Sequence, residues 1–183
     1  LLGLLRSAGG EAGSSALQQW RQEVSESLTD AQAAALGRVY FVDQKLGDDA
    51  TAEPDSLVRK YQTIQAAINA AIADNLPYSS VYIAPGNYPE ALDVIDNPDH
   101  FSISALDETL IEGITVSNAG RSLTKMSIKN LNCIGTASYG FFVSGGVFSE
   151  KLQIEGCSVS TENCFYLEEV NAKLLNCEAK VSE

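Results

Sequence analysis

Positive charge is scarce in this 183-residue chain, which has 12 Lys and Arg residues against 24 Asp and Glu residues and a formal net charge of −12. Proteins that bind nucleic acids or anionic membrane surfaces use clustered basic residues. Here the basic residues of the second half stand singly, as at Lys125, Lys129 and Lys151. We therefore expect neither a nucleic acid nor a membrane as a partner.

Several other signals are also missing. The apolar start, Leu1–Leu5, is followed at once by Arg6 and is too short to span a bilayer. No two cysteines form a Cys-x-x-Cys pair, which argues against zinc. No Asn-Gly or Asp-Gly pair separates apolar runs, which argues against β-hairpins. The sequence therefore predicts no metal and no cofactor.

A six-residue pattern recurs in the second half of the chain: an apolar residue, any residue, Gly or Asn, and then an apolar, a polar and an apolar residue. Each window is too short to bury an apolar face alone, so recurrence at this spacing predicts coils that stack. Gly and Asn enter left-handed backbone conformations most readily, so the third position predicts a bend. The windows are I-E-G-I-T-V (111–116), I-K-N-L-N-C (128–133), I-E-G-C-S-V (154–159) and L-L-N-C-E-A (174–179).

Stacking would align equivalent positions of the windows as inward-facing ladders. A parallel β-solenoid explains these data better than the alternative, an antiparallel β domain whose strands resemble one another by chance. The first expected ladder is Ile111, Ile128, Ile154 and Leu174, and the second is Ile114, Leu131, Cys157 and Cys177. The expected bends are at Gly113, Asn130, Gly156 and Asn176.

All four cysteines, Cys133, Cys157, Cys164 and Cys177, lie in the repeat region. Free cysteine behaves as a small apolar residue and is often buried, so we expect reduced core thiols. A Cys157–Cys177 disulfide is the alternative, because these residues share a ladder position. Reduced thiols would suit assembly in a cytoplasm.

The first 37 residues are predicted to form a helical N-terminal extension. Residues 1–15 are rich in Gly, Ala and Ser, whereas residues 16–36 carry an apolar stripe at helical spacing. Two interpretations stay open: the stripe packs on its own β domain, or it forms a short oligomeric coil that would be marginal alone. The stripe consists of Leu17, Trp20, Val24, Leu28 and Ala31.

Residues 37–90 contain the most specific stretch. We expect a strand over 39–43, a polar loop around 47–51, a helix over 61–73 and a strand over 81–90 that Pro85-Gly86 interrupts. A helix placed there would cover the apolar cross-section that the first coil leaves exposed.

The order of V-D…G-D-D, Y-Q-T-I-Q-A-A-I-N-A-A, V-Y-I-A-P-G-N-Y-P-E and degenerate coils resembles the pectin-lyase-like right-handed parallel β-helix superfamily over residues 38–181. That superfamily includes pectate lyases, pectin methylesterases and bacteriophage tailspikes or virion fibres, and the chain looks most like the last group. The resemblance implies a mainly β fold, with a helix-capped right-handed parallel β-helix over 38–183 after the 1–37 extension. Such a fold does not by itself define a function.

The catalytic residues of these enzymes are not evident. The pectin methylesterase motifs are missing, and Arg121 is the only arginine after Arg59. The acid pairs Asp107-Glu108 and Glu168-Glu169 are adjacent in sequence, so alternation would point the partners of a pair to opposite faces. We therefore assign no catalytic residue and do not expect an enzymatic site within this sequence.

Two further sets of polar residues are expected to lie on the surface without a catalytic role. Glu112 and Glu155 are expected to share an outward ladder position with Lys129, as alternating charges on a wall. His100 is expected to be a surface residue.

Aromatic residues crowd the later coils, and Tyr139, Phe148 and Tyr166 are candidate carbohydrate contacts. The simpler interpretation is that Phe142 and Tyr166 stack on each other as part of the wall.

The resemblance to bacteriophage fibres implies a structural protein of a bacteriophage virion, of tail-fibre, tailspike or head-fibre type, assembled in the host cytoplasm. The extension would bind other virion proteins, the shaft would be a homotrimer, and host-surface polysaccharide is a further expected ligand. We also expect the β-helix to continue beyond residue 183. The alternatives are a polysaccharide lyase or hydrolase with its site in later coils or between subunits, and a secreted bacterial adhesin or carbohydrate-binding module.

Overall fold

The computed structural model describes residues 37–117, 123–134, 140–144, 148–160, 165–168 and 172–179. The chain divides into two units, residues 1–35 and 36–183, and every described residue belongs to the second. Several predicted features lie outside the described residues: the extension with Leu17, Trp20, Val24, Leu28 and Ala31, and also Arg121, Tyr139, Cys164 and Glu169.

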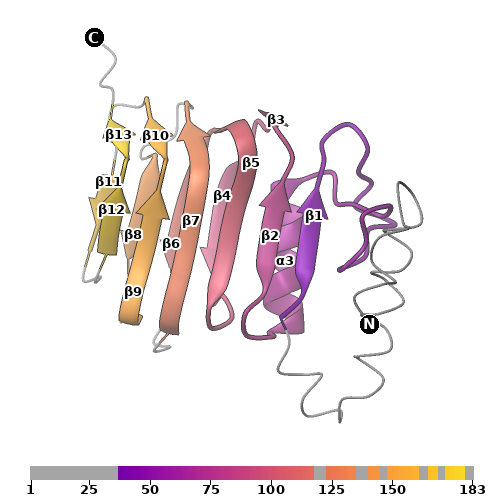
Figure 1. Ribbon diagram of the computed structural model, residues 1–183, viewed down its shortest axis with the longest axis horizontal. Helices are drawn as coiled ribbons and strands as arrows, with labels where there is room; N and C mark the ends of the chain where they lie inside the picture. Colours follow the sequence, from indigo (N-terminus) through magenta and orange to yellow (C-terminus); the bar gives the residue numbers. More distant parts are fainter. Residues whose placement is uncertain are drawn as a thin grey trace, which may run out of the picture. The chain divides into compact units, whose positions relative to one another are not determined.

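The described residues form two parallel sheets and one helix, α3 (Ile64–Asp74) (Figure 1). The larger sheet runs β1 (Val39–Val42), β2 (Ser80–Ile83), β5 (Phe101–Ile111), β7 (Leu123–Cys133), β10 (Ser158–Val159) and β13 (Glu178–Ala179). On it, β3 (Gly86–Asn87) pairs with β5, β9 (Phe148–Glu155) pairs with β7, and β12 (Ala172–Leu175) pairs with β9. The smaller sheet runs β4 (Ala91–Ile95), β6 (Gly113–Ser117), β8 (Phe141–Ser144) and β11 (Phe165–Leu167).

The chain passes back and forth between the two sheets, and each return places a strand beside its equivalent in the previous turn. All pairings between the named strands are parallel. Parallel pairing after such a crossover winds the chain into a coil. The predicted parallel β-solenoid is therefore confirmed, and the antiparallel alternative is wrong.

One inward ladder runs through the whole stack. Its members are paired in register along neighbouring strands of the larger sheet, and the first four have no exposed surface. Burying one such side chain contributes about 1.5–3 kcal/mol. The alignment of the windows that begin at 128, 154 and 174 is therefore confirmed. The ladder consists of Val81, Ile103, Ile128, Ile154 and Leu174.

The window at 111–116 was assigned to the wrong part of the coil. Ile111 pairs with Cys133 rather than with Ile128, and Ile114 lies in the smaller sheet beside Leu92 and Phe141. Gly113 is a buried strand residue without a positive φ. Glu112, next to it, is not on the Lys129 ladder, because Lys129 pairs with Ser104.

The cause of this error is an insertion. Four residues, 105–108, stand in β5 between the pairs Ser104↔Lys129 and Thr109↔Leu131, where β7 has Asn130 alone. The insertion separates the two halves of the β5 repeat, so the six-residue pattern is not continuous there. The residue equivalent to Ile128 is Ile103. The window that begins at Ile111 matched the pattern by chance.

The bends of the later turns have the predicted left-handed backbone. The φ angles are 57° at Asn130, 64° at Gly156 and 49° at Asn176. The side-chain amide of Asn130 donates from Nδ2 to the carbonyl oxygen of Ala105 at 3.2 Å, which ties its bend to the previous turn. Gly156 has a second reason to be glycine, because a Cβ there would lie 2.5 Å from Asn130 Oδ1.

The first part of the domain follows the prediction with adjusted bounds. β1 is confirmed, and the strand expected over 81–90 is divided into β2 and β3 around Pro85. The helix begins at Ile64 rather than at residue 61, because Thr63 caps it through a bond from Ala66 N to Thr63 Oγ1 at 3.2 Å. Its buried residues, Ile64, Ala67, Ile68 and Ala71, face β1, β2 and β4.

Hydrogen bonds explain why the two motifs of residues 61–90 occur together. Glu90 accepts from the first free amides of α3, Ile64 N at 3.1 Å and Gln65 N at 3.0 Å. A carboxylate at this position satisfies orphan N–H groups and complements the helix dipole. Asp49 accepts from Thr63 N at 3.1 Å and completes the cap. The Glu of A-P-G-N-Y-P-E therefore fixes the start of the T-I-Q-A-A-I helix.

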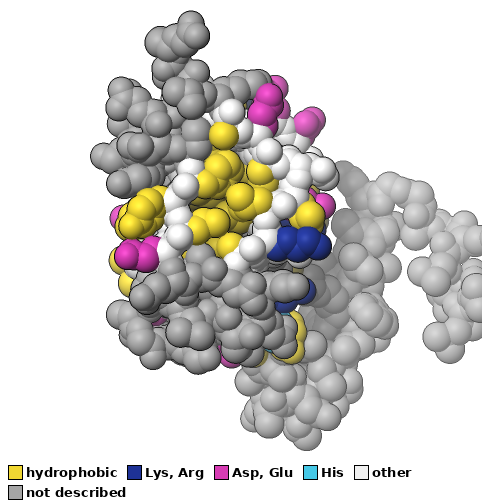
Figure 2. Space-filling model, turned by 90° about the vertical axis from the view of Figure 1, so that its left-hand side faces the viewer, with side chains coloured by type: hydrophobic (Ala, Val, Ile, Leu, Met, Phe, Trp, Pro, Cys, Tyr) yellow, Lys and Arg dark blue, Asp and Glu magenta, His cyan; other side chains and the backbone are white. Residues whose placement is uncertain are grey.

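The two ends of the solenoid differ. At the first turn, Asp55 N donates to Val39 O and Tyr61 N donates to Phe41 O, so the outer edge of β1 is covered by its own loop. At the last described turn, apolar side chains gather on the end face (Figure 2). Leu174 there is 43% exposed, although its ladder neighbour Ile154 is fully buried.

Candidate functional site

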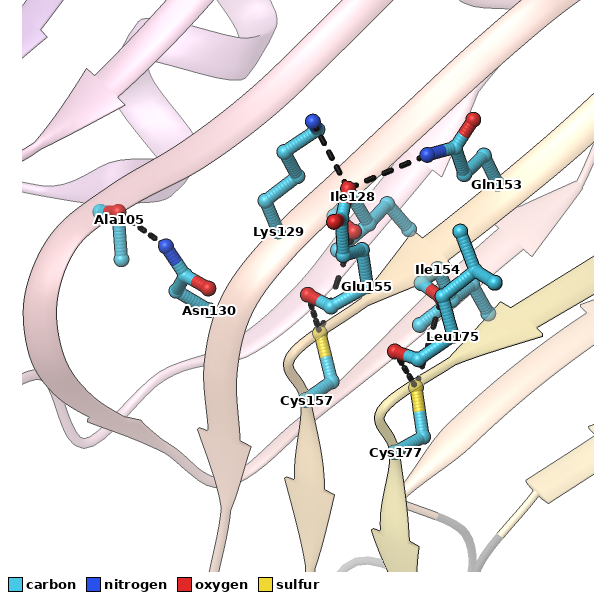
Figure 3. Close-up of polar contacts among 10 residues, drawn as sticks. All are labelled: Ala105, Ile128, Lys129, Asn130, Gln153, Ile154, Glu155, Cys157, Leu175 and Cys177. Carbon is cyan, nitrogen blue, oxygen red and sulfur yellow. Dashed lines mark hydrogen bonds and ion pairs between the residues drawn. The ribbon is translucent and has the colours of Figure 1, made fainter.

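The outer surface of the larger sheet carries a polar cluster across β7 and β9 (Figure 3). Lys129 Nζ lies 2.9 Å from Glu155 Oε2, and Gln153 Nε2 donates to the same oxygen at 3.1 Å. The hydrogen bond and the positive charge of Lys129 lower the pKa of the Glu155 carboxyl. The charge alternation expected for Lys129 and Glu155 is thus observed.

Several of the outward side chains on this face are lysines. Outward positions along β7 are held by Lys125, Ser127 and Lys129, and an exposed Lys173 follows on β12. Towards the first turn, the outward positions carry small hydroxyl residues and the half-buried pair Phe41–Tyr82, whose ring centroids are 6.1 Å apart. Outside β5, the described outward acids of this sheet are Glu155 on β9 and the exposed Glu178 on β13.

The acidic residues lie elsewhere. Asp107 and Glu108 are exposed in the 105–108 insertion beside Leu106, which is 65% exposed. The alternation expected for these two acids is wrong, because the regular ladder is interrupted at this point. Among the described residues, neither acid forms an ion pair with a basic side chain.

The outer face of the smaller sheet presents stacked aromatic rings. The rings of Phe142 and Tyr166 have centroids 5.1 Å apart and planes 4° apart, so the predicted stack is confirmed. Tyr166 is 40% exposed, and the ladder continues to Thr115 and Asp93. Aromatic faces beside hydroxyl and carboxylate groups are a common setting for sugar contact.

The carbohydrate contact predicted for Tyr139, Phe148 and Tyr166 stays a prediction, because the described residues include the side chain of Tyr166 alone. Tyr166 belongs to β11 of the smaller sheet, whereas Phe148 begins β9 of the larger sheet. Tyr139 lies outside the described residues. Among the described side chains, the candidate for sugar contact is the Phe142–Tyr166 pair.

The described thiols lie at two different positions of the coil: Cys157 and Cys177 each follow the bend of their turn, whereas Cys133 pairs with Val159 further along the strand. Cys133 and Cys157 are buried and free, as predicted, and Cys177 is free and half-buried, so no Cys157–Cys177 disulfide is present. The Sγ of Cys157 donates to Glu155 O at 3.5 Å and that of Cys177 to Leu175 O at 3.4 Å (Figure 3). Burial raises the pKa of Cys157 to about 12 and also raises that of Cys133, which keeps both thiols protonated.

Sequence reasoning missed a groove between α3 and β4. It has a volume of about 460 Å³ and is lined by Gln65, Asn69, Ile72, Ala91, Asp93 and Ile95. The Gln65 side chain accepts from Asp93 N at 2.8 Å and donates to Asp93 O at 2.9 Å, so it takes the place of a neighbouring strand at the β4 edge. No sequence signal identifies Gln65, because its partner is backbone.

His100 is half-buried and stacks on the exposed Tyr78, with ring centroids 4.4 Å apart. Within the described ranges, no three His, Cys, Asp or Glu side chains are grouped so that they could hold a metal ion. Nor does that part of the chain contain a helix long and apolar enough to cross a bilayer.

Comparison with known proteins gave no match: no protein-family model, no curated protein and no solved structure is similar to this chain.

Proposed function

We propose that this chain is a structural protein of a bacteriophage virion, of tail-fibre, tailspike or head-fibre type, in which the solenoid serves as a stiff shaft. The observation that carries the proposal is the inward ladder from Val81 to Leu174, which runs unbroken through successive turns. Backbone hydrogen bonds between parallel strands lie along the axis of such a stack. A stack of this kind keeps its direction over its full length, which suits a fibre.

The same proposal covers the hand of the coil, the role of α3 and the role of residues 1–37. The coil is taken as a right-handed, pectin-lyase-like β-helix, the hand that crossover connections between parallel strands adopt almost always. The helix α3 is its N-terminal cap, since it packs on β1, β2 and β4. Residues 1–37 would attach the shaft to other virion proteins, and three copies would assemble in the host cytoplasm.

Two measurements test this proposal. Native mass spectrometry of the expressed chain should give the mass of three chains, whereas a monodisperse monomer at micromolar concentration would contradict the homotrimer. Antibodies against the solenoid should label fibres on phage particles in electron micrographs. Labelling confined to a bacterial surface would instead favour the adhesin.

A second function is favoured by one observation, the coplanar stack of Phe142 and Tyr166 on the outer face of the smaller sheet. We propose that this face contacts host-surface polysaccharide. Tyr166→Ala should weaken retention of cells or purified capsule by about 1–3 kcal/mol of binding free energy per lost stacking contact. Tyr82→Ala is the matched control, since it removes a stacked aromatic from the other sheet. Equal losses in both variants would exclude a site on the smaller sheet.

A further inference from the structure

Cys157 and Cys177 occupy the same position in two successive turns of the solenoid. On one side of them, Gly156 N donates to Leu175 O at 2.9 Å, and on the other side Glu178 N donates to Cys157 O at 3.0 Å. These bonds hold the Cα atoms of the two cysteines one strand spacing apart, about 4.8 Å. A disulfide joins Cα atoms that are about 4.4–6.8 Å apart, so the backbone already has the separation that a bridge requires.

The two thiols also point the same way (Figure 3). Each follows a left-handed bend and donates to the carbonyl oxygen two residues before it, which is Glu155 O for Cys157 and Leu175 O for Cys177. The Sγ of Cys177 also lies 3.4 Å from Ile154 O, in the previous turn. The two side chains therefore lie side by side, and a rotation of the side chains brings the sulfur atoms towards each other.

The third described thiol is not placed for a bridge. Cys133 is also buried and free, but it lies opposite Val159 rather than opposite Cys157. Two residues add about 6.6 Å along the strand to the spacing between strands, so the Cα atoms of Cys133 and Cys157 are about 8 Å apart. Cysteines with Cα atoms more than about 7 Å apart cannot be joined without movement of the backbone.

The two aligned thiols differ in exposure. Cys177 is half-buried on the last described turn, whereas Cys157 is 1% exposed. Burial raises the pKa of Cys157 to about 12, so this residue stays a thiol and does not react first. An oxidant that arrives from solvent therefore reaches Cys177, and Cys157 is the neighbouring thiol that resolves the product. An accessible cysteine beside a resolving cysteine is a common feature of redox-responsive sites.

We propose that hydrogen peroxide joins Cys157 to Cys177 and so fixes the last described turn of the solenoid to the turn before it. In the first step, the O–O bond breaks, the thiol of Cys177 becomes a sulfenic acid and one water molecule leaves. In the second step, Cys157 Sγ forms the S–S bond, the S–O bond of the sulfenic acid breaks, and its oxygen leaves as water with the Cys157 proton. Two thiols and one peroxide thus give one disulfide and two water molecules.

The bridge would act where side chains of the stack are least covered. Leu174, on the same turn as Cys177, is 43% exposed, although its ladder neighbour Ile154 is fully buried. A covalent link between turns restricts the unfolded chain and limits local opening. Neighbouring parallel strands are spaced more widely than the Cβ atoms of a relaxed disulfide, which are about 3.8 Å apart, so the bridge would be strained and readily reduced. This reversible device does not depend on the virion function proposed above.

Peptide mass mapping after treatment with hydrogen peroxide tests the proposal. The folded wild-type chain should lose two hydrogen atoms and give one linked peptide pair that contains Cys157 and Cys177, and dithiothreitol should reverse both changes. In Cys157→Ala the sulfenic acid has no resolving thiol, so dimedone should label Cys177. Cys133→Ala is the matched control, since it removes a buried thiol that is not placed for the bridge, and its linked pair should form as in the wild type.

Thermal unfolding followed by circular dichroism shows whether the bridge fixes the end turn. The oxidised wild type should have a Tm about 2–6 °C above that of the reduced wild type, and peroxide should leave the Tm of Cys177→Ala unchanged. A linked pair with Cys133 or Cys164, a dimer joined through Cys177, or no linked pair would overturn the proposal. A Cys157–Cys177 bridge without a rise in Tm would overturn its role at the end turn. Mapping of the wild type needs no variant, so it decides the pairing even if Cys157→Ala does not fold.

Discussion

Asn130 and Gly156 occupy the same bend in successive turns, and Asn130 Oδ1 lies 2.5 Å from the position that a Cβ of residue 156 would take. Both residues have a left-handed backbone, with φ of 57° and 64°. The bend of one turn thus restricts the residue allowed at the bend of the next. Contact between neighbouring turns is the main source of stability in a repeat structure.

Gly156→Ala should therefore destabilise the solenoid by about 1–3 kcal/mol, because the methyl group adds a clash to an unfavourable φ. Urea unfolding followed by circular dichroism measures this loss. Asn176→Gly is the matched control at an exposed bend with φ of 49°, and we expect a change within about 0.5 kcal/mol. Similar effects at both bends would argue against the Asn130 contact.

The inward ladder allows a comparison between two neighbours. Ile154→Ala should cost about 2–5 kcal/mol of unfolding free energy, since the side chain is fully buried. Leu174→Ala should cost clearly less, because that side chain is 43% exposed on the last described turn. Denaturant titration of both variants checks this order. Equal costs would mean that the end face is covered in solution.

Glu90 can be tested as the cap of α3. Glu90→Ala removes the acceptor of Ile64 N and Gln65 N, and we expect a loss of about 1–2 kcal/mol together with some helical signal. Glu112→Ala is the control, as it removes an equal charge from another bend. If the two variants were equally stable, the carboxylate of Glu90 would not be needed to fix the helix.

The Lys129–Glu155 pair predicts a dependence on pH. The pKa of Glu155 is lowered in the folded protein, so the pair stabilises it above the carboxyl's ordinary pKa of about 4.3 and stops doing so as pH falls through the lowered pKa. Lys129→Met should remove this contribution at neutral pH and make no difference in strong acid. The Glu155 pKa, followed by NMR, should rise in Lys129→Met and stay unchanged in Lys45→Met.

Thiol chemistry should follow burial. Because the pKa of Cys157 is raised to about 12, alkylation at pH 8 should leave Cys157 and Cys133 unmodified in the folded chain. The half-buried Cys177 should react before either of them. Peptide mass mapping with and without urea gives the order. Rapid labelling of Cys157 without denaturant would show that the core opens there.

Sequence patterns predicted the fold where the repeat is uninterrupted. Ile128, Ile154 and Leu174 could be aligned because each is followed by a bend of one Gly or Asn residue before the next apolar position. The 105–108 insertion separates the same elements in β5, so Ile111 was aligned instead of Ile103. A sequence pattern with fixed spacing cannot align turns whose bends differ in length.

The surface was harder to predict than the core. Lys129 and Glu155 share a ladder position in the sequence pattern, so their pairing was accessible, as was the Phe142–Tyr166 stack. The groove beside α3 was not accessible, because Gln65 bonds to backbone atoms that any residue 93 would supply. Thr63 illustrates a third case, since it caps α3 but was included in the predicted helix.

The bulge in β5 also bears on how such a chain can change over evolutionary time. On one side of it Ser104 stays opposite Lys129, and on the other side Thr109 stays opposite Leu131, so the strands regain their register beyond the added residues. Of these four residues only Ala105 is buried in the core, whereas 106–108 are exposed. A corner can therefore gain or lose surface segments while the ladders inside are preserved. A solenoid of this type can acquire new binding specificities one corner at a time, at little risk to its ability to fold.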